Sequence, residues 1–202
     1  MFEVELKAVV DDLDLRRQRM DAAGAELTFE GRLSDKRYDL PSRALAQRDE
    51  VLRVRRYETT DSVQAHVDWK GPTDSAGAYK VREEISTVVA DFKGLSSILE
   101  KLGYVVTREI DRRVVQYRCG AATVRFEVYP RMDVLVEVEG EPPVIEDAIA
   151  ALGMLRGEFT TERLAVFVDR FERRTGVRAA ISDRELVGDY ALREAEGSSG
   201  LG

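Results

Sequence analysis

Charged and apolar residues alternate along this chain from its first positions, as side chains do on a β-strand. In residues 1–7, Glu3, Glu5 and Lys7 occupy every second position, and apolar residues fill the positions between them. Successive side chains of a strand point to opposite faces, so one face carries two carboxylates and an ammonium group while the other is apolar. The same alternation predicts strands over Glu50–Glu58, Val63–Lys70, Tyr79–Val88, Ala122–Tyr129 and Val134–Glu139.

Other segments repeat apolar residues at helical spacing. The first can be capped by Asp11 or Asp12 and stops near Gly24. The predicted helices are Asp11–Ala23, Asp91–Leu102, Pro142–Leu152 and Thr160–Arg174. Further strands are predicted as a pair within Ala25–Asp39, broken near Gly31, and as one segment over Tyr104–Tyr117. Pro41–Asp49 and Thr73–Ala78 are expected to be connections.

The repetition of one-sided strands favours a closed barrel over a sandwich. A sandwich would place the apolar strand faces inside and the charged faces in water, and this explains any single strand. It fits the whole set less well, because the apolar stripes of the helices also need sheet surface to cover. In a closed antiparallel barrel the apolar faces point outward beneath the helices, and the charged faces line the lumen. The pattern therefore predicts an α+β fold with helices packed on the outside of a barrel.

Composition bounds the class of protein. The 202 residues, 44% of them hydrophobic, suffice for one domain, at most two, with a sizeable core. The formal net charge of −7 argues against non-specific binding to nucleic acid or to an anionic membrane. The single cysteine, Cys119, excludes an intramolecular disulfide and is typical of a reducing compartment. The chain also has a single histidine, His66, so it has too few cysteine and histidine ligands for an expected zinc site.

The ends of the chain carry two further expectations. No basic-then-apolar leader precedes the first strand and no apolar run approaches the length of a membrane span, so the expected location is cytoplasmic. One domain is predicted over residues 1–194. Residues 195–202, which are rich in glycine and serine, are predicted to form a disordered C-terminal tail.

A charged lumen suggests a class of ligand. Desolvated, unpaired charges are costly, so the lumen must contain water. Phosphate oxygens suit arginine and lysine, whereas carboxylates tolerate a phosphate only with a cation between them. Mg²⁺ and Mn²⁺ prefer oxygen ligands, so either ion could lie between the carboxylates and the phosphates. The strand pattern places these cations on the lumen face: Arg53, Arg55, Lys70, Lys80, Arg82 and Arg125.

An ordered set of short motifs resembles the CYTH domain. The motifs are Glu3-x-Glu5-x-Lys7, Arg53-x-Arg55, Trp69-Lys70-Gly71-Pro72, Arg82-Glu83-Glu84 and Glu137-x-Glu139. The resemblance runs from Phe2 to about Leu192. This superfamily, the triphosphate tunnel metalloenzymes, includes class IV adenylyl cyclases, thiamine triphosphatases and inorganic triphosphatases. The resemblance implies an eight-stranded antiparallel tunnel that binds a triphosphate together with Mg²⁺ or Mn²⁺.

Carried over position by position, the resemblance implies roles for individual residues. The carboxylates that would hold the metal are Glu3, Glu5, Glu127, Glu137 and Glu139. The side chains that would bind the phosphates are Lys7, Arg53, Arg55, Lys70, Arg82 and Arg112, and the strand pattern adds Lys80 and Arg125 to them. Tyr38 and Lys70 match a Tyr–Lys pair of some triphosphatases of the family. These two residues and Glu5 are the predicted catalytic residues.

Some positions depart from the family's pattern. Glu127 stands where the family usually has an aspartate, so its carboxylate is one methylene further from the backbone. A family Lys-x-Arg pair reads Arg112-Arg113-Val114 here, and Arg113 would face away from the lumen unless a bulge intervenes. His66 shares a strand face with Lys70 and is an alternative general base.

The leading functional hypothesis is chemistry like that of class IV adenylyl cyclases, in which the ribose 3′-oxygen of ATP attacks the α-phosphorus and pyrophosphate leaves. One alternative is a triphosphatase that hydrolyses thiamine triphosphate, inorganic triphosphate or a nucleoside triphosphate. Another is a non-catalytic nucleotide- or polyphosphate-binding module, against which the Glu-x-Glu pairs weigh. The expected partner is a nucleoside or other organic triphosphate, with no nucleic acid and no membrane. A homodimer could form through an unpaired strand edge.

Overall fold

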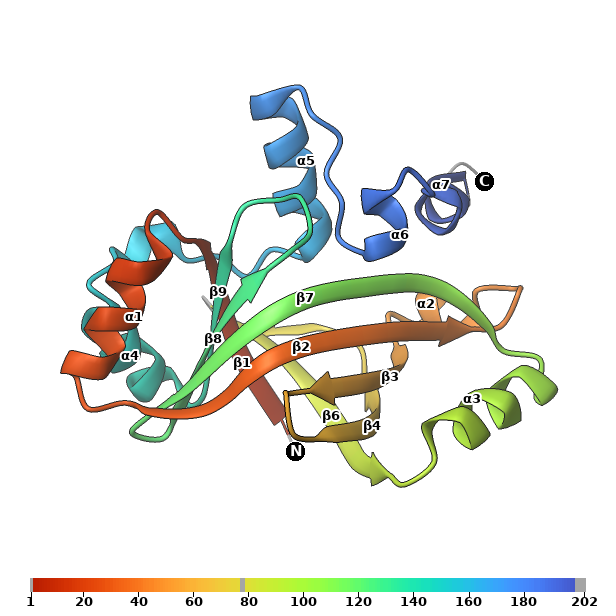
Figure 1. The fold of residues 1–202 in the computed structure, drawn as a ribbon, viewed down its shortest axis with the longest axis horizontal. Coiled ribbons are helices and arrows are strands. Elements are labelled where there is room, and N and C mark those ends of the chain that lie inside the picture. Colours follow the sequence, from red (N-terminus) through yellow and green to blue (C-terminus); the bar gives the residue numbers. More distant parts are fainter. Residues whose placement is uncertain (1, 77–78, 199–202) are drawn as a thin grey trace.

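Eight antiparallel strands close into a barrel in the described part of the chain, residues 2–76 and 79–198 of a computed structural model (Figure 1). The strands are β1 (Phe2–Val9), β2 (Glu26–Asp39), β3 (Val51–Glu58), β4 (Val63–Lys70), β5 (Asp74–Ala76), β6 (Tyr79–Val89), β7 (Val105–Cys119), β8 (Ala122–Val128) and β9 (Leu135–Glu139). They follow the order β1-β9-β8-β7-β2-β3-β4-β6, and pairing of β6 with β1 closes the ring. The short β5 pairs with β6. The predicted eight-stranded closed barrel is confirmed.

Helices surround the barrel, as predicted. They are α1 (Leu13–Ala22), α2 (Ala44–Gln47), α3 (Phe92–Lys101), α4 (Pro142–Leu152), α5 (Leu164–Thr175), α6 (Asp183–Leu186) and α7 (Ala191–Ser198), with a 3₁₀ turn η1 at Arg156–Glu158. Asp12 caps α1 by accepting a hydrogen bond from the Leu15 N–H at 3.0 Å. The helix α5 begins later than predicted because the backbone of Thr160 pairs with Lys7 of β1, at N···O distances of 2.8 and 2.9 Å.

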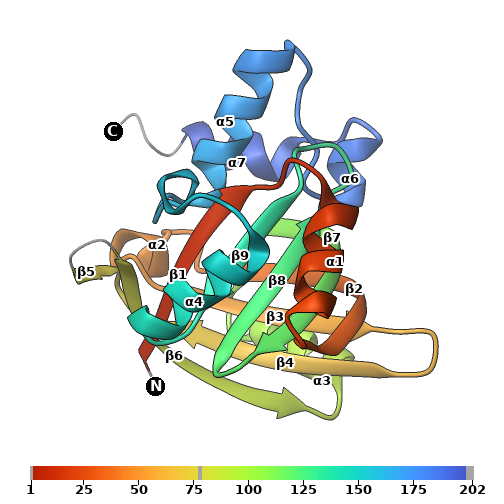
Figure 2. The same cartoon turned by 90° about the vertical axis from the view of Figure 1, so that its left-hand side faces the viewer.

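The apolar faces of the strands point outward and form the core with the helices. Figure 2 shows α1 and α4 lying against the barrel wall that contains β8 and β9. Leu6, Phe126 and Val136 from this wall pack with Met20 of α1 and Ile145 of α4, all with no exposed surface. Each such side chain contributes about 1.5–3 kcal/mol by burial. The stability of the barrel therefore comes mainly from its outside, and the inside is left for charged side chains.

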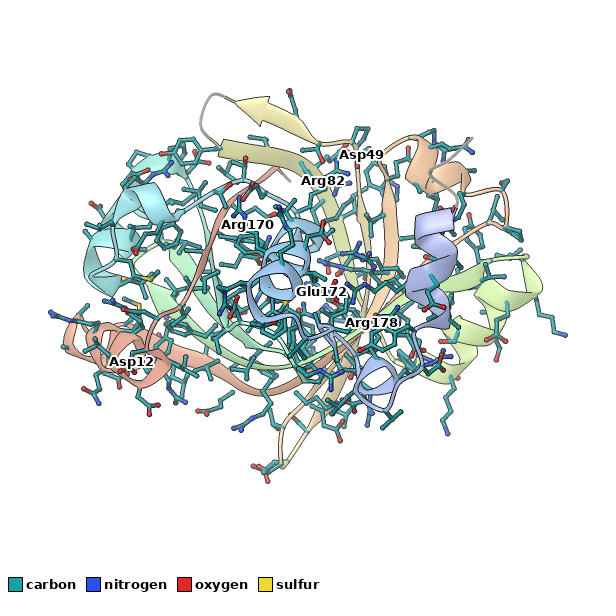
Figure 3. The ribbon with its side chains drawn as sticks, turned by 90° about the horizontal axis from the view of Figure 1, so that it is seen from above. Asp12, Asp49, Arg82, Arg170, Glu172 and Arg178 are labelled. Atoms are coloured by element: carbon teal, nitrogen blue, oxygen red, sulfur yellow. The ribbon has the colours of Figure 1, made fainter. Side chains whose placement is uncertain are left out.

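One helix covers part of the barrel mouth. Seen from above, α5 crosses the centre of the barrel (Figure 3). Its Phe167 and Val168 form a buried cluster with Ile110 of β7 and Leu135 of β9. Ile110 lines the lumen, and Leu135 lies on the same strand face as Glu137, two residues further along. The helix α5 therefore closes the mouth on the β7–β9 side with apolar contacts.

The segment predicted as two strands is the single long strand β2. Its pairing with β7 shifts between Leu27 and Phe29, but the strand continues through Gly31. A Cβ atom at Gly31 would lie 2.2 Å from the carbonyl oxygen of Glu58 and 2.9 Å from the ring of Phe29. The prediction of a break was wrong. The missing side chain of Gly31 allows β2 and β3 to approach each other closely, and the residue does not form a turn.

The remaining sequence predictions concern connections and ends. The expected connection Pro41–Asp49 contains α2, and the expected turn Thr73–Ala78 contains β5, with positions 77–78 outside the described residues. No helix in the described part of the chain has the length and apolar character that crossing a membrane requires. The helix α7 includes the first positions of the predicted tail, whereas 199–202 lie outside the described residues. The domain boundary at residue 194 stays a prediction.

The contact at Gly31 predicts a large cost for a small substitution. In Gly31→Ala the new methyl group must displace the Glu58 carbonyl, so we expect a loss of about 1–3 kcal/mol in the free energy of unfolding. The measurement is urea denaturation followed by circular dichroism. Gly157→Ala is the control, because a Cβ atom there would meet nothing within 4 Å. Equal stability of the two variants would contradict the close strand approach.

Candidate active site in the barrel lumen

The lumen contains a cavity of about 320 Å³. Among the described residues that line it, ten are lysine or arginine and five are aspartate or glutamate, so the lining is positive although the chain carries a formal charge of −7. The cations are Lys7, Arg37, Arg53, Arg55, Lys70, Arg82, Arg108, Arg112, Arg125 and Arg163. The carboxylates are Glu5, Asp35, Asp49, Glu127 and Glu137.

Three carboxylates meet on the wall formed by β1 and β9. Glu5, Glu137 and Glu139, here called the carboxylate cluster, each offer an oxygen, and these oxygens lie within 4.8 Å of one another. The strand register produces this, because Glu5 lies opposite Glu139 and Glu137 shares the lumen face of β9. Carboxylate oxygens at this spacing are the donor set that Mg²⁺ and Mn²⁺ prefer, so these residues fit a divalent cation.

Two cations contact the carboxylate cluster. Lys7 Nζ lies 2.9 Å from Glu5 and also pairs with Glu137, while Arg125 Nη1 lies 2.9 Å from Glu137 and 3.3 Å from Glu139. Burial opposes the charge of Glu137, but Lys7, a hydrogen bond with Glu139 and Arg125 outweigh it, and its pKa lies well below the ordinary value. Burial likewise lowers the pKa of Lys7, but Glu137 and Glu5 raise it above its ordinary value. Both groups are therefore charged at neutral pH.

On the opposite wall, one buried aspartate positions the two β3 arginines that face the lumen, Arg53 and Arg55. Asp68 is 1% exposed, accepts a hydrogen bond from Arg53 Nε at 2.8 Å and lies 3.1 Å from Arg55 Nε. The Ser86 hydroxyl donates to its other oxygen at 2.6 Å. Burial lowers the pKa of Arg53, but nearby carboxylates, Asp35 first among them, raise it above the ordinary value. Both guanidinium groups are thus fixed in the lumen.

Arg112 joins two further carboxylates. It donates to Asp35 at 2.9 Å and to Glu127 at 2.6 Å, and the Tyr129 hydroxyl donates to the other oxygen of Glu127 at 2.6 Å. Burial raises the pKa of Asp35, but Arg112 and then Arg53 lower it below the ordinary value. Glu127 lies in the lumen but outside the carboxylate cluster. Its assignment as a metal ligand stays a prediction.

At the rim of the mouth, Asp49 accepts hydrogen bonds from both Arg82 and Arg163. Arg82 donates hydrogen bonds to the backbone oxygens of Gly71, at 2.7 Å, and of Asp49. Figure 3 shows Arg82 and Asp49 close together at the edge of the opening. The carboxylate of Asp49 accepts from Arg163, the residue before α5, at 3.0 Å. The start of α5 is therefore linked to the strands that carry the lumen cations.

Most of the predicted site residues line this one cavity. They are Glu5, Lys7, Arg53, Arg55, Lys70, Arg82, Arg112, Arg125, Glu127 and Glu137. Lys70 ends β4 and lies 2.9 Å from Glu84. Glu3 and Lys80 belong to β1 and β6, opposite Arg82 and Glu5 respectively, but their side chains lie outside the described part of the structure.

Tyr38 does not face the lumen, so the prediction of a Tyr38–Lys70 catalytic pair was wrong. The ring of Tyr38 is 3% exposed and packs with Val54 and Leu99 beneath α3. Its hydroxyl lies 3.2 Å from that of Ser96 in α3. The reason is strand alternation: Arg37, the preceding residue, lines the cavity, so Tyr38 points outward.

The structure also locates Arg113 and His66, whose relation to the lumen the sequence left open. Arg113 is exposed, and the pairing of β7 has no bulge between Arg112 and Arg113, so Arg113 faces away from the lumen. The half-buried ring of His66 makes an edge contact with Tyr57, at 5.4 Å between ring centroids. His66 is not among the described residues that line the cavity.

Sequence reasoning missed several residues of the lumen. Asp35 and Arg37 alternate on β2 in the same way as Glu3 and Glu5 on β1, so the strand pattern could have identified them. Asp68 shares that pattern with Lys70. Arg163 carries no such signal, because it precedes a helix and reaches the lumen only through the position of α5.

Comparison with known proteins agrees with this geometry. A family model described as the CYTH domain matches residues 1–151. No curated protein matches the chain. A solved structure from Vibrio parahaemolyticus, described as a candidate adenylate cyclase, has a TM-score of 0.71 and 20% identity, and the match covers 84% of this chain and 98% of that one. A solved structure of a Pyrococcus horikoshii protein has a TM-score of 0.65 and 19% identity, and the match covers 82% of this chain and 98% of that one.

A third structure is a candidate adenylyl cyclase from Hippeastrum that is described as revealing a dominant triphosphatase activity. It has a TM-score of 0.59 and 16% identity, and the match covers 83% of this chain and 96% of that one. At these identities the structural matches establish the fold only. The family match spans every strand of the barrel and the whole carboxylate cluster. The chain therefore belongs to the CYTH domain family.

Proposed function

We propose that this protein is a metal-dependent triphosphatase, which hydrolyses the terminal phosphate of an organic triphosphate held in the lumen. The observation that carries the proposal is the carboxylate cluster beside a cavity lined by lysine and arginine. The CYTH family acts on triphosphate substrates and generally uses divalent metals.

Glu5, Glu137 and Glu139 would hold the metal. When bound, Mg²⁺ or Mn²⁺ would neutralise the charge of the phosphate oxygens that face these carboxylates and polarise the phosphorus they surround. Lys7 and Arg125 already contact the same carboxylates and would bind those phosphate oxygens. The cluster therefore combines a cation site with two fixed basic side chains.

The basic residues of the opposite wall would bind the remaining phosphates. Arg53 and Arg55 are held by Asp68, and a phosphate can accept from their remaining N–H groups. Hydrogen bonds between charged groups contribute about 1.5–3 kcal/mol each. Because the side chains are already ordered, little conformational entropy is lost on binding. Catalysis then comes mainly from positioning and from neutralisation of developing charge.

The lining of the lumen favours hydrolysis over cyclisation. A cyclase must hold the ribose in line with the α-phosphorus and keep water away from it. Here charged side chains make up most of the cavity wall, and such a wall is hydrated. Among the described residues that line it, Tyr129 is the only aromatic one, and its hydroxyl is bonded to Glu127. This reverses the preference for a cyclase that the sequence alone suggested.

Product analysis tests the reaction. With ATP and Mn²⁺ or Mg²⁺ at mildly alkaline pH, we expect ADP and orthophosphate, because hydrolysis at the terminal phosphate gives these two products. Anion-exchange chromatography separates these from cyclic AMP and pyrophosphate, and a reaction without metal is the control. Cyclic AMP as the main product would assign the protein to the cyclases. No turnover of ATP, thiamine triphosphate or inorganic triphosphate would overturn the proposal.

Substitution of the carboxylate cluster tests the metal dependence. In Glu137→Gln the shape is kept and a charge is lost, so we expect kcat/KM at limiting Mg²⁺ to fall by about 100-fold or more. The variant should also lose about 1–3 kcal/mol of unfolding free energy, since Lys7 and Arg125 each lose a charged partner. Metal titration of activity and urea denaturation measure the two effects. Exposed Glu141→Gln is the control. Unchanged turnover in Glu137→Gln would place the metal elsewhere.

A further inference from the structure

A groove of about 640 Å³ lies beside the barrel mouth, where β2 ends and β3 begins. Its described lining residues are Arg37, Tyr38, Asp39, Pro41, Ser42, Arg43, Ala46, Gln47, Glu50, Val51, Leu52 and Thr107. Arg37 and Val51 also line the lumen cavity. These two residues form an edge that the groove shares with the cavity, while Tyr38 and Leu52 line the groove from the outward strand face. It is here called the mouth groove.

The mouth groove is built from an ordered connection. Asp39, 4% exposed, accepts hydrogen bonds from the N–H groups of Leu40, Leu45 and Ala46 at 2.7–3.0 Å. These bonds hold α2 against the end of β2. The Gln47 side chain donates to a backbone carbonyl of the same connection at 3.0 Å. A ligand would thus meet a preformed wall.

The chemistry of the mouth groove differs from that of the lumen. Its described lining contains two arginines, Arg37 and Arg43, and two carboxylates, Asp39 and Glu50. The charges balance, so the groove offers no excess attraction for a further phosphate. Apolar side chains lie beside hydroxyl and amide groups, a mixture that suits a neutral group with hydrogen-bonding edges. A nucleoside has that character.

The barrel order fixes the direction of a bound ligand. The carboxylate cluster is on β1 and β9, and the mouth groove adjoins β2 and β3, which lie diametrically opposite in the ring of eight strands. On the β7–β9 side the mouth is covered by Phe167 and Val168 of α5. A triphosphate that reaches from the carboxylate cluster past Arg53 and Arg37 therefore places its organic end at the mouth groove.

We propose that the mouth groove binds the organic group of the substrate, of the nucleoside class, while the terminal phosphate lies at the carboxylate cluster. The assignment rests on the proposed function, because it assumes that the lumen binds the triphosphate. It also accounts for the phosphate that reacts: the α-phosphate lies at the rim, beside Arg37 and its cross-strand neighbour Arg53, away from the carboxylates.

Filling the mouth groove separates the organic group from the phosphates. Ala46 is exposed and lines the groove, so Ala46→Trp places an indole where the nucleoside would lie. We expect kcat/KM for ATP to fall about 10-fold or more, with kcat/KM for inorganic triphosphate unchanged within about twofold, since that substrate has no organic group. Ala150→Trp, on the exposed face of α4 and outside the groove, is the matched control and should change neither value.

Two other kinetic results would overturn the proposal, and a binding measurement tests it if no turnover is seen. Equal activity of Ala46→Trp on both substrates would show that the groove is not used, and equal loss on both would assign the effect to folding or to the lumen. If the unaltered protein turns over neither substrate, the proposed function fails. Calorimetry with Mn²⁺ and a non-hydrolysable ATP analogue, against inorganic triphosphate, then still decides whether Ala46→Trp weakens only the nucleotide.

Discussion

The pairing of buried cations with buried carboxylates is the constraint on which this structure depends. A guanidinium group inside a barrel is stable only where carboxylates replace its hydration. Arg112, placed between Asp35 and Glu127, and Arg125, placed between Glu137 and Glu139, meet this condition. Because the lumen is occupied in this way, the apolar core has to lie outside the barrel, between the strands and the helices.

The same pairing prepares the lumen for a polyanion. Carboxylates hold several of the basic side chains in place, among them Lys7, Arg53, Arg112 and Arg125. The site therefore does not have to order these long side chains when a phosphate arrives. The carboxylates also oppose an isolated anion. A triphosphate with a divalent cation satisfies both signs of charge at once. Under the proposed function, the lumen would favour a metal–polyphosphate complex over either component alone. Neither the arginines nor the glutamates would provide that specificity by themselves.

A segment beyond the family match covers part of the mouth of the lumen. The match ends at residue 151, and α5 follows it. This helix places Phe167 and Val168 on the β7–β9 side of the mouth, and Asp49 links Arg163 to the opposite rim. The β7–β9 side of the mouth is consequently closed by apolar contacts. The covering of the mouth is therefore a property of this chain's C-terminal packing as much as of its barrel.

The sequence by itself determined which strands have a charged face and which residues lie on it. Strand alternation is a local property, so the sequence alone assigns Glu5, Lys7, Arg53, Arg55 and Glu137 to one face. The ordered motifs then led to the CYTH fold and to its triphosphate chemistry. The error at Gly31 had a local cause as well, because a glycine in a strand can mark a break or a close approach, and the pattern cannot distinguish them.

Only the tertiary structure decided how those faces meet. Register placed the oxygens of Glu5, Glu137 and Glu139 together and left Glu127 with Arg112 and Tyr129. Packing beneath α3 then buried Tyr38, which strand alternation points away from the lumen. Contacts between residues far apart in the chain, such as that of Asp49 with Arg163, leave no periodic signal. The sequence determines which way each side chain points along its own strand, whereas the distances between strands come from closure of the barrel.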